Sequence, residues 1–352
     1  RRVCDEFATV EQPRFVAGSM GPTGFLPSSS GPALSRITFT ELVDAFTEQA
    51  QGLIEGGADL LVIETAQDIL EVRAAILGSR AAFARTGLRL PLHVSVSLDV
   101  SGRMLLGTDP GAVVAILESL GAAVIGVNCS TGPELMRNPL RVITERSSRP
   151  VACIPNAGIP LNVGGRASYP MEPAPMAAEL EDFVTRLGVA IVGGCCGSTP
   201  AHIEELVRRV RGKRRAAPVG DGIPRLASAM SAVDLQQVPA PLLIGERVNA
   251  QGSRAVKRLL LAEDYDGMVA VGRAQAEGGA HALDVCVAVT ERSDEAEQMR
   301  QVVRGLQMAV DSPLIFDSTD ADVIRVALEN YPGRGVVNSV NLENGRTRCE
   351  AL

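Results

Sequence analysis

The chain has 352 residues, 46% of them hydrophobic, which is enough to build two domains with separate cores. A formal net charge of −7 excludes the basic surface expected of a protein that binds nucleic acid or an anionic membrane, and it favours a small-molecule ligand. Seven cysteines are too few for a disulfide scaffold of this length, and the sequence shows neither a secretory leader nor a run of about 18 apolar residues, so we expect a cytoplasmic protein.

Apolar runs that predict buried strands alternate with helical patterns in the first part of the chain, as in repeated βα units. The six predicted strands are residues 15–17, 60–63, 92–96, 124–127, 151–154 and 189–192. The predicted helices include residues 40–55, 111–120 and 201–210, and residues 3–10 have the pattern of the tail of a further helix. A closed eight-stranded barrel requires two more strands, which we expect to precede residue 1.

A second series of the same kind follows a stretch rich in Gly, Pro and Ser that predicts a linker. Its predicted strands are residues 242–244, 282–285, 313–316 and 335–337, and its predicted helices are residues 255–261, 265–277, 293–309 and 322–330. We therefore predict an α/β fold of two tandem (β/α)8 TIM barrels, the first lacking its N-terminal strands and the second its C-terminal half. The predicted domains are residues 1–215 and 241–352, joined by a linker of residues 216–240.

Three cysteines lie at the predicted carboxyl ends of strands in the first part: Cys129, Cys195 and Cys196. Such positions converge on one face of a parallel barrel, so the three thiols can meet in space. Three thiolates are enough to hold a zinc ion and to leave a fourth position open for a substrate sulfur. Gly193 and Gly194 fit this interpretation, because they leave room where the backbone passes a metal or ligand. The alternative is a closed zinc site or buried, reduced cysteines.

Other polar residues of the first part also follow predicted strands. Glu64 ends an otherwise apolar strand, where a carboxylate suits an ammonium group or is simply solvated. Asn128 and Asn156 stand where an amide can bind a substrate carboxylate, fix a ligand loop or form a turn. The Gly-rich segment 18–24 can offer backbone N–H groups to a carboxylate.

Several of these residues belong to four short segments of the first part: Ile63-Glu64-Thr65, Gly126-Val127-Asn128-Cys129, Pro155-Asn156-Ala157-Gly158 and Gly193-Gly194-Cys195-Cys196-Gly197. Together the segments resemble the homocysteine-binding barrel of the zinc-dependent homocysteine methyltransferases. The resemblance implies that Cys129, Cys195 and Cys196 are the zinc ligands and catalytic residues. It also implies homocysteine contacts at Glu64, Asn128 and Asn156, with the amine bound by Glu64.

The second part carries three further segments: Gly245-Glu246-Arg247-Val248-Asn249-Ala250-Gln251-Gly252, Phe316-Asp317-Ser318-Thr319 and Val337-Asn338-Ser339. They resemble the methyltetrahydrofolate-binding barrel of the cobalamin-dependent methionine synthases, which follows a homocysteine barrel in the same order. The resemblance covers nearly the whole sequence, and it implies a piece of such an enzyme without a cobalamin-binding or reactivation module.

Polar side chains at the predicted strand ends of the second part suit the flat edge of a pterin, whose adjacent donors and acceptors Asp and Asn can bind bidentately. By the resemblance, the folate-binding residues are Glu246, Asn249, Asp284, Asp317 and Asn338. The sequence departs from the family at Cys286, where we expect Asn, so the folate contacts next to Asp284 are in question.

The resemblance implies methyl transfer from methyltetrahydrofolate, by way of cobalamin, to homocysteine that zinc activates. Only a thiolate attacks a methyl group well, and zinc displaces the thiol proton at neutral pH. The expected partners are homocysteine, methyltetrahydrofolate and a cobalamin-binding domain or subunit, with neither nucleic acid nor a membrane. Two alternatives are a homocysteine methyltransferase with another methyl donor and a non-catalytic zinc or redox-sensing barrel protein.

Overall fold

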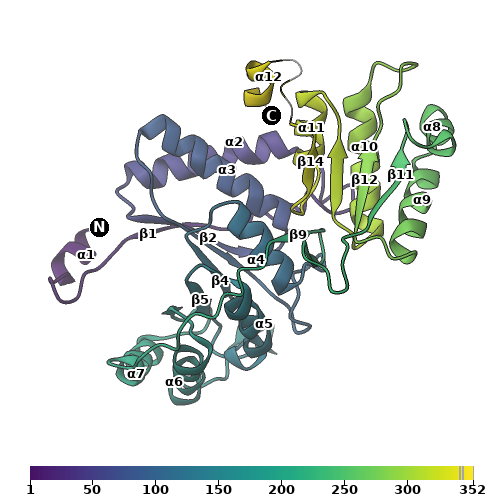
Figure 1. Ribbon diagram of the computed structural model, residues 1–352. Coiled ribbons are helices and arrows are strands. Elements are labelled where there is room, and N and C mark those ends of the chain that lie inside the picture. The colour runs from purple at the N-terminus through teal and green to yellow at the C-terminus, as the bar shows by residue number, and fades with distance from the viewer. Residues whose placement is uncertain (341, 343–344, 352) are drawn as a thin grey trace. The chain divides into compact units, whose positions relative to one another are not determined.

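The computed structural model describes residues 1–340, 342 and 345–351. The chain forms two compact units, Arg1–Gly222 and Ile223–Leu352, and each is built on its own parallel β-sheet (Figure 1). The predicted α/β class with two parallel-stranded units is therefore confirmed. Within the described residues, neither sheet closes into a barrel. None of the described helices is long and apolar enough to cross a membrane.

The first unit contains a six-stranded parallel sheet in the order β1-β2-β3-β4-β5-β8. Its strands are β1 Ala17–Met20, β2 Leu60–Ala66, β3 Leu92–Val96, β4 Val124–Asn128, β5 Val151–Ile154 and β8 Ile191–Val192. Parallel neighbours require a crossover connection, which explains the helices between the strands. All five residues of β3 are buried, as expected for a parallel strand that is covered on both faces.

The helices of the first unit begin at sequence signals of the expected kind. Thr38 and Glu41 form a capping box, and Asp68 and Asp109 each cap a helix by accepting a backbone N–H. The helices are α1 Arg2–Phe7, α2 Phe39–Glu55, α3 Ile69–Thr86, α4 Pro110–Ser119, α5 Pro133–Arg146, α6 Pro173–Asp182, η1 Phe183–Leu187 and α7 Pro200–Val210. A hairpin of β6 Leu161–Val163 and β7 Arg166–Ser168 interrupts the series between β5 and α6.

The second unit contains a four-stranded parallel sheet in the order β11-β12-β13-β14. Its strands are β11 Ile244–Asn249, β12 Ala282–Cys286, β13 Leu314–Asp317 and β14 Val336–Asn338. Its helices are α8 Arg254–Leu261, α9 Tyr265–Glu277, α10 Glu295–Ala309, α11 Ala321–Glu329 and α12 Arg346–Ala351. The core includes Phe316 and Tyr331, whose rings meet edge to face with centroids 5.2 Å apart.

The predicted linker 216–240 contains structure that the sequence analysis did not predict. Strands β9 Arg225–Ala227 and β10 Ala232–Asp234 form an antiparallel hairpin in the second unit. The hydroxyl of Tyr331 donates to the carbonyl of Ala227, and Leu226 packs against the sheet residues Ala282 and Ile315. The Gly and Pro content predicted a flexible segment, but these few long-range contacts order it.

The predicted bounds of several strands differ from those in the structure, among them those of the first strand and of β11. The first strand begins at Ala17, where pairing with β2 starts, and not at Phe15, whose side chain is exposed. Strand β11 starts at Ile244 and runs on through polar residues to Asn249, which lies opposite Cys286 of β12. Backbone pairing with the neighbouring strand continues there although the apolar run has ended.

The crossing of α2 and α3 depends on a glycine. A Cβ added to Gly78 would lie 2.8 Å from Phe46 Cβ, 2.8 Å from the Val43 carbonyl oxygen and 2.9 Å from the Thr47 nitrogen. Two of these neighbours are backbone atoms, which cannot rotate away. We expect Gly78→Ala to lower the free energy of unfolding by about 1–3 kcal/mol despite the better helix propensity of alanine.

The matched control is Gly52→Ala in α2, where an added Cβ has no atom within 4 Å. This substitution is expected to be neutral or to stabilise the protein by up to about 1 kcal/mol. Urea denaturation of both variants measures the difference. Equal stabilities would show that the α2–α3 contact tolerates a methyl group.

Candidate functional site

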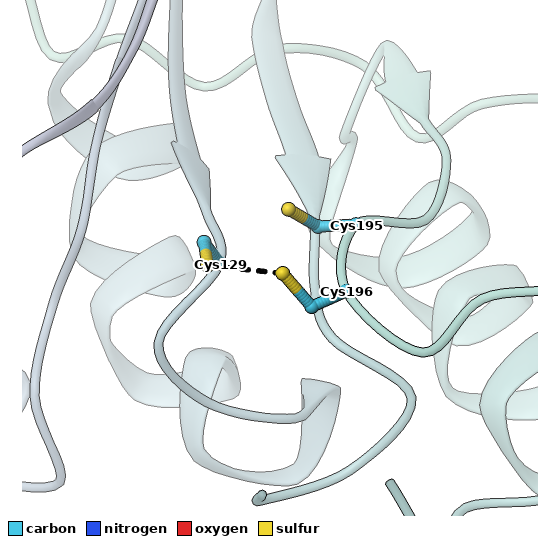
Figure 2. Close-up of side chains that lie close together, drawn as sticks. All are labelled: Cys129, Cys195 and Cys196. Carbon is cyan, nitrogen blue, oxygen red and sulfur yellow. Dashed lines mark hydrogen bonds between the residues drawn. The ribbon is translucent and has the colours of Figure 1, made fainter. Parts of the chain in front are cut away.

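The structure brings Cys129, Cys195 and Cys196 together. Cys129 follows β4, and the other two follow β8, at the carboxyl ends of strands that lie on either side of β5. The three sulfur atoms all lie within 4.8 Å of one another, and Cys129 Sγ is 3.8 Å from Cys196 Sγ (Figure 2). A tetrahedral zinc site with Zn–S bonds of about 2.3 Å separates its sulfurs by about 3.8 Å, so this donor set fits zinc.

Backbone hydrogen bonds hold the two cysteine loops against the last residue of β5 and the residues that follow it. The Cys129 N–H donates to the carbonyl of Ile154 at 3.1 Å, and the Cys195 N–H donates to that of Pro155 at 2.7 Å. The carbonyl of Cys196 accepts from the Ala157 N–H at 2.9 Å. The positions of all three thiols are therefore set by one central segment.

The backbone at Cys129 has an unusual conformation. Cys129 and Ser130 have φ values of 59° and 63°, in the left-handed region that non-glycine residues seldom occupy. The Thr131 N–H donates to the Cys129 carbonyl at 2.7 Å, and the Thr131 carbonyl accepts from Asn156 N–H at 3.1 Å, which holds this turn. Strained backbone of this kind occurs where surrounding structure over-determines a functional position.

The two glycines that precede the cysteine pair differ in their surroundings. A Cβ on Gly194 would lie 2.2 Å from Ser198 Oγ, so the loop requires glycine there. A Cβ on Gly193 would meet no atom closer than 3.8 Å. The close approach expected from the sequence thus applies to Gly194 and does not apply to Gly193.

Hydrogen bonds among the thiols concentrate negative charge on one sulfur. The thiol of Cys195, the N–H of Ser130, the thiol of Cys196 and the amide of Asn156 all donate to Cys129, and they lower its pKa. The pKa of Cys195 is raised, because its thiol donates to Cys129 and because burial disfavours its charged form. A divalent cation held by the three sulfurs would stabilise their ionised forms.

The amide of Asn156 lies within the cysteine cluster. Its Oδ1 accepts from the N–H of Cys196 at 3.1 Å, and its backbone N–H donates to the carbonyl of Thr131, in the loop that follows Cys129, at 3.1 Å. The side chain is buried. Asn156 therefore connects the two cysteine loops.

Asn128 holds the backbone next to Glu64. Its Oδ1 accepts from the Thr65 N–H at 2.8 Å, and its Nδ2 donates to Thr65 Oγ1 at 2.9 Å. The side chain of Asn128 is 0% exposed, and Thr65 has a φ of 60°, a conformation that these two bonds stabilise. Glu64 is half-buried near the carboxyl end of β2, where its carboxylate accepts a hydrogen bond from the hydroxyl of Ser19.

Two buried acids that the sequence analysis did not single out hold the loop after β1. Asp68 accepts from Ser28 N–H at 2.8 Å and Ser28 Oγ at 2.7 Å, and Glu71 accepts from Thr23 N–H at 2.8 Å. Burial raises the pKa of both carboxyl groups. The available sequence signal is the position of Asp68 and Glu71 at the start of α3.

A second polar cluster lies at the carboxyl ends of the strands in the second unit. Asn249 Nδ2 donates to Asp284 Oδ2 at 2.9 Å and to Asp317 Oδ2 at 3.2 Å, and Asn338 at the end of β14 lies opposite Asp317 in the strand register. Burial raises the pKa of Asp284, and the charges of Asp317 and Glu246 raise it further. The structure therefore gathers all five predicted folate-binding side chains at one edge, where the acids favour a ligand with N–H donors.

A β-bulge sets the position of Glu246. Gly245 pairs with Leu283 and Val248 with Val285, so two residues of β11 lie opposite one residue of β12. The Arg247 N–H that the bulge frees donates to Gln275 Oε1 at 2.7 Å. Sequence patterns do not reveal a bulge, and Gln275 was missed for that reason.

Cys286 is buried and protonated in this cluster. Burial, together with the carboxylates of Asp317 and Asp284, raises its pKa to about 11. Its carbonyl accepts from the Ala250 N–H at 2.8 Å. The thiol thus places a small neutral group where the resemblance leads us to expect an amide.

The chain belongs to the homocysteine S-methyltransferase family, whose sequence model matches residues 1–210. Residues 245–351 match the pterin binding enzyme family. The chain is similar to two proteins named methionine synthase: it is 40% identical over 350 residues to that of Mycobacterium leprae (strain TN) and 39% identical over 345 residues to that of Mycobacterium tuberculosis (strain ATCC 25618 / H37Rv). The resemblance seen in the short sequence segments is therefore confirmed.

Each of these alignments covers 98% of this chain, and the chain spans 28% of the length of either relative. Two solved structures of the homocysteine methyltransferase MmuM from Escherichia coli also match, with 24% sequence identity over 56% of this chain. The apo form gives a TM-score of 0.43 over 63% of its own chain, and the metallated form gives 0.40 over 62%.

Proposed function

We propose that this chain takes part in methyl transfer from 5-methyltetrahydrofolate, by way of cobalamin, to homocysteine, giving methionine and tetrahydrofolate. The observation that carries the proposal is the cluster of three cysteine sulfurs within 4.8 Å of one another, in a chain of the homocysteine S-methyltransferase family. The match to pterin binding enzymes supports folate as the methyl source over another donor.

In this proposal, Cys129, Cys195 and Cys196 hold a zinc ion and leave its fourth position to the substrate sulfur. The ion supplies positive charge that keeps a thiol deprotonated at neutral pH. The protein orients the ligand set, because Asn156 hydrogen-bonds to both cysteine loops, through its side chain to Cys196 and through its backbone to Thr131. The left-handed turn at Cys129 directs that thiol toward the pair (Figure 2).

We further propose that Glu64 binds the ammonium group of homocysteine. Its half-buried carboxylate lies near the carboxyl end of β2, toward the same edge of the sheet as the cysteines, and Ser19 donates to it. Asn128 is fully buried and already bonded twice to Thr65. We therefore assign Asn128 the role of holding Thr65 and Glu64 in place, with no direct substrate contact.

In the second unit we propose that Asp284, Asp317, Asn249 and Asn338 bind the pterin edge of methyltetrahydrofolate, with Glu246 beside them. A pterin offers adjacent N–H donors to the carboxylates and acceptors to the amides. Cobalamin would be bound by a separate domain or subunit.

The cysteines are all free, which supports a reducing, cytoplasmic compartment.

Calorimetric titration of homocysteine into zinc-loaded and metal-free protein tests the proposal. Because the sulfur is expected to complete the metal site, we predict binding to the zinc-loaded protein and at least about tenfold weaker binding without zinc. Homoserine, which has a hydroxyl in place of the thiol, is the control and should bind weakly in both cases. Equal affinity for homocysteine with and without zinc would point to a non-catalytic metal site.

A further inference from the structure

The side chain of Gln275 extends from α9 to β11, the first strand of the sheet in the second unit. Its Oε1 accepts from the Arg247 N–H at 2.7 Å. Its Nε2 is buried and has no hydrogen-bond partner among the residues that the structure describes. Because a buried donor without a partner costs free energy, the contact that Oε1 makes with β11 requires an explanation.

A glycine gives Gln275 access to this strand. A Cβ on Gly245 would lie 2.7 Å from Gln275 Oε1 and 3.0 Å from Leu283 Cδ2. A side chain at position 245 would therefore point toward α9 and displace the amide of Gln275. The direction of this Cβ also identifies the face of β11 that α9 covers.

The bulge in β11 turns the residues beyond it to the opposite face. In a regular strand, side chains four residues apart point the same way, so a side chain at position 249 would face α9. The bulge adds one residue between Gly245 and Val248 and reverses this direction. Val248 is consequently buried in the core. Asn249, on the other face, donates to Asp284 and Asp317.

We propose that Gln275 is a positioning residue for the folate site, whose Oε1 holds the backbone N–H of Arg247 in the bulge and thereby keeps Asn249 directed at Asp284 and Asp317. This inference rests on the proposed binding of the pterin at that edge. Gln275 lies on the face of β11 that α9 covers, so it acts through the backbone and does not contact the ligand.

Calorimetric titration of 5-methyltetrahydrofolate into the unaltered protein, Gln275→Met and Gln275→Glu tests the inference. Methionine has nearly the same length as glutamine but lacks the acceptor. We expect it to weaken binding about 5- to 10-fold, as for the loss of one hydrogen bond. Glutamate keeps an oxygen acceptor for the Arg247 N–H, so Gln275→Glu should bind the ligand more tightly than Gln275→Met does.

A double-mutant cycle with Asn249→Ala separates positioning from a general loss of structure. If Gln275 acts through Asn249, Gln275→Met should change the affinity less than about twofold in the Asn249→Ala background. A general structural defect would cause the same loss in both backgrounds. The matched control is Gln301→Met, because Gln301 lies in a helix of the same unit and donates only to Glu297 on the surface of α10. It should bind the ligand like the unaltered protein.

Three results would overturn the role of Gln275 and leave the folate site intact. These are equal affinity of Gln275→Met and the unaltered protein, an equal loss in the Asn249→Ala background, and no gain of Gln275→Glu over Gln275→Met. Failure of the unaltered protein to bind 5-methyltetrahydrofolate would overturn the proposed folate site and this inference with it.

Discussion

Replacement of Cys195 by serine is expected to weaken zinc binding by more than about 100-fold. This loss of affinity exceeds the loss usually caused by removing a group that only hydrogen-bonds to a metal-binding side chain. Serine has nearly the same shape, but its hydroxyl stays protonated and cannot replace a thiolate ligand. The remaining pair, Cys129 and Cys196, would hold the ion with two sulfurs. Competition with a chromophoric chelator measures the affinity, and metal analysis measures the occupancy.

Cys4→Ser is the matched control for this experiment. Cys4 lies in α1, outside the cluster, and is free and partly exposed like Cys195. Its replacement should leave the zinc affinity at the unaltered value. Full zinc occupancy with unchanged affinity in Cys195→Ser would remove Cys195 from the ligand set.

Replacement of Asp317 by alanine is expected to weaken methyltetrahydrofolate binding by about 5- to 150-fold. The loss of a polar partner from a buried ligand costs about 1–3 kcal/mol, which corresponds to that range. Asp317 also accepts from Asn249, so its removal disturbs a second proposed contact. Zinc content and homocysteine affinity should stay unchanged, because the cysteines belong to the other compact unit.

The control for this substitution is Asp322→Ala. Asp322 lies in the same unit but is exposed, and it pairs with Arg325 on the surface of α11. Surface pairs of this kind contribute little, so folate binding and stability should hardly change. Titration of methyltetrahydrofolate into each variant gives the affinities. If Asp317→Ala bound folate as tightly as the control variant does, the pterin site would lie elsewhere and another methyl donor would become the better hypothesis.

The sequence was sufficient to predict the sheets and the convergence of the three cysteines. Buried parallel strands are continuous apolar runs, and their carboxyl ends must lie at one edge of a sheet. This is why Cys129 and Cys196, 67 positions apart, were expected together and are found together. The same rule placed Asp284 and Asp317 at one edge of the second sheet.

The sequence alone could not predict roles that depend on the direction in which a single side chain points. Asn128 follows a strand as a ligand-binding amide would, yet it is turned inward to Thr65. The hairpin of β9 and β10 was missed because a long-range bridge from Ala227 to Arg334 orders it.

X-ray absorption spectroscopy of zinc-loaded protein, before and after addition of homocysteine, tests the proposed chemistry most directly. We predict that the free protein shows three sulfur neighbours from Cys129, Cys195 and Cys196, at about 2.3 Å from the metal. Homocysteine should add one sulfur neighbour at about the same distance. A metal shell that keeps its original sulfur count when homocysteine is bound would contradict activation of the substrate thiol at this site.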